Sequence, residues 1–169
     1  MIITLQSKTP TQGIKYDFNG KTKTLFGGSF FEAPGQGYVT VNLMQEYPLQ
    51  CDAYVPIKDF SIPNGEQTKQ MVEAFEEILS SDKDAFVGCF GGRGRTGLFM
   101  ACFLKYLGYN DVISQVRSEY HPHAVETGEQ MEYVWGFNHR FSGDSLENHE
   151  QPVNEKDSGE PNSFRSPSF

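Results

Sequence analysis

The chain has 169 residues, 14% aromatic side chains and a net charge of −8 at pH 7 from 22 acidic and 14 basic residues. This length suits one domain with a substantial core, and the acidic balance argues against a nucleic-acid binder that relies on a broad basic face. Its three cysteines form no Cys-x-x-Cys pair or Cys/His cluster, which argues against a disulfide framework and a zinc site.

The first half of the chain predicts short strands followed by one helix. Residues 1 to about 38 have the glycines and prolines of short strands joined by turns. The β-branched run Tyr38–Met44 predicts a buried strand, and Ala53–Ile57 predicts a second, shorter one. Asn64 is placed to cap a helix, because apolar residues then recur at helical spacing until 80–82.

Strands and helices continue to alternate in the second half. Residues 85–87 are an apolar run that predicts a strand, and 97–107 predict a helix that is apolar on all sides and therefore central. Another helix is expected over 111–120. This alternation indicates an α/β domain over 1–141, with a sheet whose loop ends carry the site.

The last predicted helix begins at Thr127, which forms a capping-box pattern with Gln130. From 142 to 169 the composition changes to Ser, Asn, Glu, Pro and Gly, which indicates a disordered acidic tail. No apolar stretch suggests a secretion signal or a membrane span, so we expect a cytoplasmic protein without membrane contact. We also expect a monomer. The apolar face of the last helix is expected to carry Met131, Val134, Trp135 and Phe137.

The most informative feature is a cysteine separated from an arginine by five residues, three of them glycine. A strand, a tight glycine loop and a helix N-terminus form an anion cradle, because backbone N–H groups converge there and the helix dipole adds positive potential. A cysteine at the mouth of this cradle is expected to act as a thiolate nucleophile. The simpler alternative is a glycine-rich turn with a buried structural cysteine. The segment is Cys89-Phe90-Gly91-Gly92-Arg93-Gly94-Arg95-Thr96-Gly97.

These residue types fit phosphate monoester cleavage through a thiol. Cys89 is the candidate nucleophile, and the N–H groups from Phe90 to Arg95 can bind the phosphoryl oxygens. The Arg95 guanidinium can add a bidentate grip that a lysine cannot copy. Thr96 is placed to bond the Cys89 sulfur through its hydroxyl, or to act as a helix cap.

The general acid is expected on a loop after a strand. Asp59 is the candidate, since it precedes Pro63 on a segment that could fold over the cradle. An ordinary turn aspartate is an equal alternative, and Asp52 competes on charge alone. Gln130 could orient the hydrolytic water, although the capping box explains it more simply. We interpret His121 and His123, on either side of a proline, as loop histidines near the rim of the site.

Three motifs in this order resemble the cysteine-dependent protein phosphatases, specifically the dual-specificity branch and its kinase-associated phosphatase group. The family pattern Cys-x5-Arg-Ser/Thr is matched over 89–96, the mobile acid loop over 56–63, and a third motif over 125–130. The resemblance covers roughly residues 38 to 140. It implies a central, mainly parallel sheet flanked by helices, a phosphorylated protein as substrate, no nucleic-acid partner, and no metal or organic cofactor.

The resemblance also implies roles for individual residues. Cys89 would form a phosphocysteine, Arg95 would bind the transferring group, Asp59 would serve as acid and then base, and Gln130 would place the water. Two departures concern the surroundings of the site. Gly88 stands where the family usually has a histidine, and the arginine usual near position 120 is replaced by 120–123, Tyr-His-Pro-His.

Other functions use a similar anion loop. A phosphatase fold slowed by Gly88 could serve as a module that binds phosphorylated partners. A phosphoinositide or an RNA 5′-phosphate is an alternative substrate; Arg93 resembles a loop lysine of lipid phosphatases, but Phe90 does not match their second lysine. A sulfur-transfer or arsenate-reducing enzyme would need a resolving cysteine, for which Cys102, within an apolar helix, is poorly placed.

Overall fold

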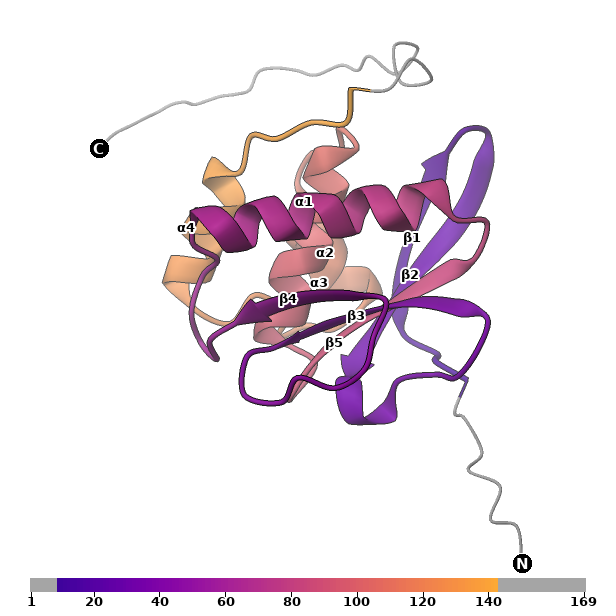
Figure 1. Ribbon diagram of the computed structural model, residues 1–169. Coiled ribbons are helices and arrows are strands. Elements are labelled where there is room, and N and C mark those ends of the chain that lie inside the picture. Colours follow the sequence, from indigo (N-terminus) through magenta and orange to yellow (C-terminus); the bar gives the residue numbers. More distant parts are fainter. Residues whose placement is uncertain (1–8, 143–169) are drawn as a thin grey trace, which may run out of the picture.

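A five-stranded sheet organises residues 9–142, the part of the chain that the structure, a computed structural model, describes (Figure 1). Its strand order is β1-β2-β5-β3-β4. β1 pairs antiparallel with β2, and the other three pairings are parallel, which confirms the predicted mainly parallel sheet. The strands are β1 (Gly13–Phe18), β2 (Lys21–Ser29), β3 (Tyr38–Met44), β4 (Ala53–Ile57) and β5 (Asp84–Cys89).

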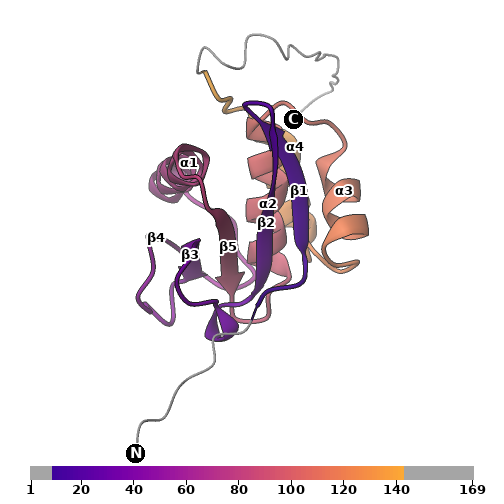
Figure 2. The same cartoon turned by 90° about the vertical axis from the view of Figure 1, so that its right-hand side faces the viewer.

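Four α-helices pack on one face of this sheet (Figure 1), and the view turned by 90° separates them from the short turn after β2 (Figure 2).

Among the described residues no helix is long and apolar enough to cross a membrane. All but residue 142 of the predicted tail lies outside the described residues. The helices are α1 (Gly65–Ser80), α2 (Gly94–Tyr106), α3 (Val112–Glu119) and α4 (Gly128–Gly136), with a 3-10 turn, η1 (Phe30–Glu32), after β2.

Local sequence signals set the helix boundaries. Asn64 and Gln67 form a reciprocal capping box at the start of α1, and Thr127 and Gln130 form another at the start of α4, as predicted. The expected apolar face of α4 is wrong at one position, because Trp135 is 66% exposed. α2 begins three residues earlier than predicted, at Gly94, so the glycine loop enters the helix directly.

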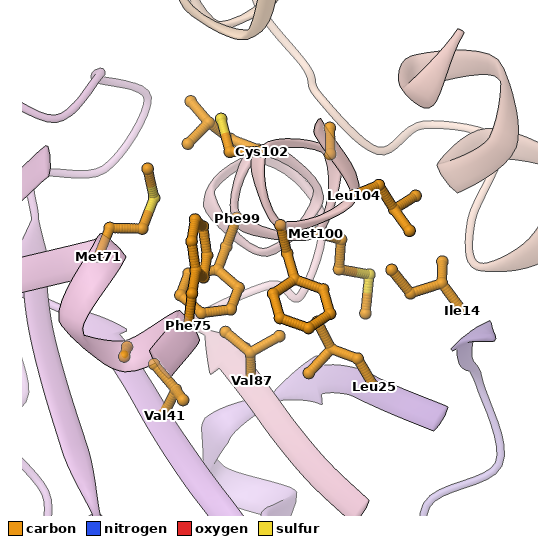
Figure 3. Packing of buried hydrophobic residues seen from close by; sticks show 14 of the residues in the cluster. Ile14, Leu25, Val41, Met71, Phe75, Val87, Phe99, Met100, Cys102 and Leu104 are labelled. Atoms are coloured by element: carbon orange, nitrogen blue, oxygen red, sulfur yellow. The ribbon is translucent and has the colours of Figure 1, made fainter. Parts of the chain in front are cut away.

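Aromatic side chains of α1 and α2 form the centre of the core (Figure 3). The Phe75 ring lies edge-on to Phe99 and Phe103, with ring centroids 4.9 and 5.4 Å apart. The strands contribute the layer beneath them, which includes Val87. Because strand side chains alternate, Phe86 points to the opposite face, where Phe30 of η1 packs against it at 6.3 Å.

The four parallel strands end at the same edge of the sheet. Their carboxyl ends are Ser29, Met44, Ile57 and Cys89. Four loops therefore meet at this edge, and side chains far apart in the sequence are brought together there. The carboxyl edge of a parallel sheet is where ligands bind in open α/β folds.

Replacing Phe75 by alanine should destabilise the fold strongly, because Phe75 is fully buried and packs α1 against two aromatic rings of α2. We expect a loss of about 3–5 kcal/mol in the free energy of unfolding, measured by urea titration. The exposed Trp135→Ala is the control and should change it by about 0.5 kcal/mol or less. Similar effects of the two substitutions would contradict this packing.

Candidate active site

Cys89 ends β5 at the sheet edge, and its side chain is 3% exposed. The Thr96 hydroxyl donates a hydrogen bond to its sulfur at 3.1 Å, and the Gly92 N–H donates another at 3.2 Å. The structure thus contains the predicted contact between Thr96 and Cys89. Thr96 is not the helix cap, since the N-cap of α2 is Arg93, which makes no side-chain capping bond. Two hydrogen-bond donors are therefore aimed at the one sulfur.

Backbone packing against the β2–η1 segment requires glycine at two positions, Gly92 in the loop and Gly88 at the end of β5. Gly92 has φ +75°, and a Cβ there would lie 2.6 Å from the Gly28 carbonyl carbon. A Cβ at Gly88 would lie 2.8 Å from the backbone N and Cα of Phe30. The family's usual histidine therefore cannot enter at Gly88 unless η1 moves. The close packing of η1 therefore explains why glycine replaces the family's histidine at position 88.

The loop passes into the N-terminus of α2. The first intrahelical hydrogen bond runs from Gly97 N–H to Arg93 C=O at 2.8 Å, so the N–H groups of Gly94, Arg95 and Thr96 have no helical acceptor. They lie at the positive end of the helix dipole. Of the N–H groups predicted to bind the phosphoryl oxygens, those of Gly94 and Arg95 are thus without a helical acceptor, whereas that of Gly92 donates to the Cys89 sulfur.

Arg95 is buried at 1% exposure and joins three segments. Its Nη1 and Nη2 donate to the two carboxylate oxygens of Glu46 at 2.8 and 2.9 Å, and Nη1 also donates to the Ile57 carbonyl at 2.9 Å. Nη2 lies 3.3 Å from the Asp59 carboxylate. Within the described residues the Arg95 Nε is buried without a hydrogen-bond partner, so it is a donor available to a bound anion.

The ion pair between Arg95 and Glu46 shifts the pKa values of both groups. Burial alone lowers the pKa of Arg95, but its hydrogen bonds to Glu46 and the charges of Cys89 and Asp59 raise it overall. The hydrogen bonds from Arg95 lower the pKa of Glu46. Both groups therefore stay ionised through the neutral range, and the guanidinium plane is held by a two-point contact.

Asp59 follows β4 and comes to the same edge as Cys89. Its side chain is 49% exposed, and one carboxylate oxygen also accepts from the Phe60 N–H at 3.0 Å. The competing acid, Asp52, lies elsewhere. It accepts from the Thr40 N–H at 2.8 Å and lines a hollow of about 830 Å³ to which no residue of 89–97 contributes. Of the two, only Asp59 is therefore close to Arg95.

Gln130 is buried and lies between the Cys89 loop and the segment after β4 that carries Asp59. Its side-chain oxygen accepts from the N–H groups of Glu126 and Thr127 at 2.9 and 3.1 Å, as the capping interpretation requires. Its amide nitrogen donates to the Ser61 carbonyl at 3.4 Å, and a Cβ at Gly94 would lie 3.2 Å from both its polar atoms. The role of Gln130 in placing the water stays a prediction, and its side chain lies near both Gly94 and Ser61.

The sequence did not reveal the role of Glu46 or that of Tyr120. Glu46 is one acid in an exposed loop, and no local pattern marks it as the partner of Arg95. Tyr120 is 6% exposed, and its hydroxyl donates to the Gly92 carbonyl, which fixes the loop from behind. The guanidinium of Arg117 donates to the carbonyls of Ala124 and Val125. Near position 120, where the family usually has an arginine, this chain thus has a tyrosine that hydrogen-bonds to the Cys89 loop.

The two histidines lie in a turn near the loop, since burial and then the charge of Arg93 lower the pKa of His121. His121 accepts from the His123 N–H at 3.0 Å in its own turn. Cys102 is fully buried in α2, and burial raises the pKa of its thiol, which is unfavourable for a resolving cysteine. Among residues 9–142 no three His, Cys, Asp or Glu side chains are grouped so that they could hold a metal ion.

Comparison with known sequences points to one family. Residues 38–109 match the model described as "Polymorphic toxin system, DSP-PTPase phosphatase". Two uncharacterised proteins of Methanocaldococcus jannaschii, MJ0215 and MJECL20, are 40% and 39% identical to the chain over 90 residues, 53% of it. The match spans 57% and 61% of the lengths of these relatives.

Comparison with solved structures agrees with the sequence matches. Tk-PTP in its active form is 29% identical, with a TM-score of 0.52 over 60% of this chain and 79% of that one. Kinase-associated phosphatase, solved with its catalytic-site cysteine replaced by serine, has a TM-score of 0.54 over 75% of this chain and 93% of its own. At 19% identity this second likeness concerns the fold alone.

Replacing Glu46 by glutamine should destabilise the chain, because it leaves the buried guanidinium of Arg95 without its two-point partner. We expect a loss of about 1–3 kcal/mol near neutral pH, at the lower end because Glu46 is partly exposed. The pKa of Glu46 is lowered by folding, so its contribution exists above the ordinary value of 4.5 and is lost as the pH falls through the folded value.

The measurement is the urea unfolding free energy of both proteins as a function of pH. The difference between wild type and Glu46→Gln should be largest near neutral pH and should shrink in acid. Glu73→Gln, on the exposed side of α1, is the matched control and should leave the stability unchanged. A difference that stays constant as Glu46 protonates would contradict the assigned ion pair.

Proposed function

Because the chain belongs to the dual-specificity phosphatase family, we propose that it hydrolyses phosphotyrosine in proteins through a phosphocysteine intermediate, with phosphoserine and phosphothreonine as further substrates of the same chemistry. One observation carries the proposal. The Cys89 sulfur accepts hydrogen bonds from Thr96 and Gly92 at the N-terminus of α2, and the unpartnered Nε of the buried Arg95 belongs to the same helix turn.

In the first step the Cys89 sulfur attacks the phosphorus atom. The S–P bond forms as the ester P–O bond breaks, and the leaving oxygen takes a proton from Asp59. The three equatorial oxygens are bound by the free N–H groups at the start of α2 and by Arg95. These donors are already oriented, so they stabilise the charge that spreads over the oxygens in the transition state.

In the second step a water molecule attacks the phosphocysteine. Asp59, now a carboxylate, takes the proton of that water, the S–P bond breaks, and inorganic phosphate leaves. Thr96 and Gly92 support this step, because their hydrogen bonds to sulfur make the Cys89 thiolate a better leaving group. Gln130 lies between Gly94 and the acid segment, and we assign it to orient the water.

Glu46 acts as a positioning residue. Its two-point ion pair fixes the plane of the Arg95 guanidinium, and the Ile57 carbonyl ties the same group to the strand that leads to Asp59. The clamp and the acid are thereby held relative to each other. Such placement of donors and acid before substrate arrives is the main source of catalysis by a site of this kind.

The test compares wild type, Cys89→Ser and Asp59→Asn on a phosphotyrosine peptide and on para-nitrophenyl phosphate. Cys89→Ser should abolish phosphate release from both substrates. Asp59→Asn should lower kcat on the peptide by about 100-fold to 10,000-fold, the range for loss of a general acid. The loss on para-nitrophenyl phosphate should be smaller, because nitrophenolate leaves without protonation.

Asp52→Asn is the matched control and should retain full activity, since Asp52 lies at the amino end of β4 beside Thr40 of β3, at the opposite end of these strands from the candidate site. Equal phosphate release by wild type and Cys89→Ser would overturn the enzymatic proposal. Phosphopeptide binding without turnover would make the chain a binding module instead. Hydrolysis of a phosphoinositide or a 5′-phosphorylated RNA in preference to the peptide would replace the substrate class.

A further inference from the structure

Exposed apolar side chains gather at the sheet edge that carries the candidate site. Among the described residues six large hydrophobic side chains are exposed, and five of them lie in the loops that follow β2, β3, β4 and β5. Single exposed hydrophobic residues are ordinary, whereas a cluster beside a site marks an interaction surface. The five are Phe31, Tyr47, Leu49, Phe60 and Phe90, and the sixth is Trp135 of α4.

Three of these side chains contact one another, and we name Phe31, Tyr47 and Phe90 the aromatic platform. The ring centroid of Phe31 lies 5.3 Å from that of Tyr47 and 5.6 Å from that of Phe90, both edge-on. Tyr47 and Phe90 are stacked at 6.2 Å. The three rings are 44–53% exposed, so they support one another while each keeps a face or edge open to solvent.

In the sequence, each residue of the platform directly follows a residue of the candidate site or one that packs against it. Phe90 follows Cys89, and Tyr47 follows Glu46, the partner of Arg95. Phe31 follows Phe30, whose backbone packs against Gly88. A ligand on the platform is therefore beside the Cys89 loop, close enough to belong to the same molecule as a phosphate bound there.

The absence of charge on the aromatic platform indicates which kind of ligand it can bind. The three rings carry no charge, and the chain as a whole has a net charge of −8. A single-stranded nucleic acid stacks its bases on aromatic rings only where a basic groove follows its phosphates. The residue next to Tyr47 is Glu46, whose carboxylate is paired with Arg95 and offers a second phosphate no positive charge. An uncharged apolar side chain needs no such charge.

We propose that the aromatic platform binds an apolar side chain that neighbours the phosphorylated residue in a substrate polypeptide, and so sets sequence preference. This inference rests on the proposed phosphatase function and adds a recognition element to it. The platform acts on substrate affinity, whereas the Cys89 loop, Arg95 and Asp59 perform the reaction.

The experiment uses two phosphotyrosine peptides that differ only in the residues on each side of the phosphotyrosine, leucine in one and serine in the other. Wild type should have a kcat/KM about tenfold higher for the leucine peptide, as burial of one apolar side chain provides. Phe31→Ala and Tyr47→Ala should remove this preference and leave kcat/KM for para-nitrophenyl phosphate unchanged. Tyr47→Phe should keep the preference, and Trp135→Ala is the exposed control.

Binding of the same peptides to the Cys89→Ser protein, followed by fluorescence anisotropy, separates the two claims. A leucine preference in binding without turnover by wild type would defeat the proposed function and uphold the platform. An equal loss on peptides and on para-nitrophenyl phosphate would show that the rings only support the loop, and would overturn the inference. So would an unchanged preference in the alanine variants, or a 5′-phosphorylated oligonucleotide that depends on the rings while the peptides do not.

Discussion

The candidate site depends on the burial of one guanidinium group. Arg95 is almost fully buried in the first turn of α2, where an unpaired cation would be costly. Glu46 compensates with a two-point contact, and the Ile57 carbonyl and Asp59 complete its surroundings. These partners come from the loop after β3, the end of β4 and the loop after β4, so one buried charge joins three segments at the sheet edge. The arrangement leaves the Arg95 Nε for a ligand.

Much of this arrangement could be predicted, because its signals are local in the sequence. The segments Tyr38–Met44 and Ala53–Ile57 have the composition of buried strands and form β3 and β4 with the predicted bounds. The Cys89 loop is contiguous, so its glycines, Thr96 and Arg95 indicate an anion cradle without knowledge of the fold. The residues alone left two equal interpretations of Asp59, a general acid and an ordinary turn aspartate. Only the resemblance of residues 56–63 to the family's acid loop favoured the general acid.

The remaining features depend on contacts that no local pattern encodes. Glu46 meets Arg95 across 49 residues of sequence, and only the parallel pairing of β3 with β5 brings its loop to the site. Gly88 follows from the approach of the Phe30 backbone, which no periodicity reveals. Trp135 fits a helical apolar stripe, yet it lies outside the surface that α4 buries. The aromatic platform likewise arises from rings in three separate loops.

The most direct measurement of the central claim is the chemical state of Cys89 during turnover. The chain would be mixed with a phosphotyrosine peptide, quenched with denaturant at alkaline pH within the first turnovers, and mapped by peptide mass spectrometry. The account predicts one phosphoryl group on the Cys89 sulfur, present while phosphate is being released and absent once substrate is exhausted. Continued phosphate release with Cys89 never phosphorylated would contradict it, because water would then attack the substrate directly.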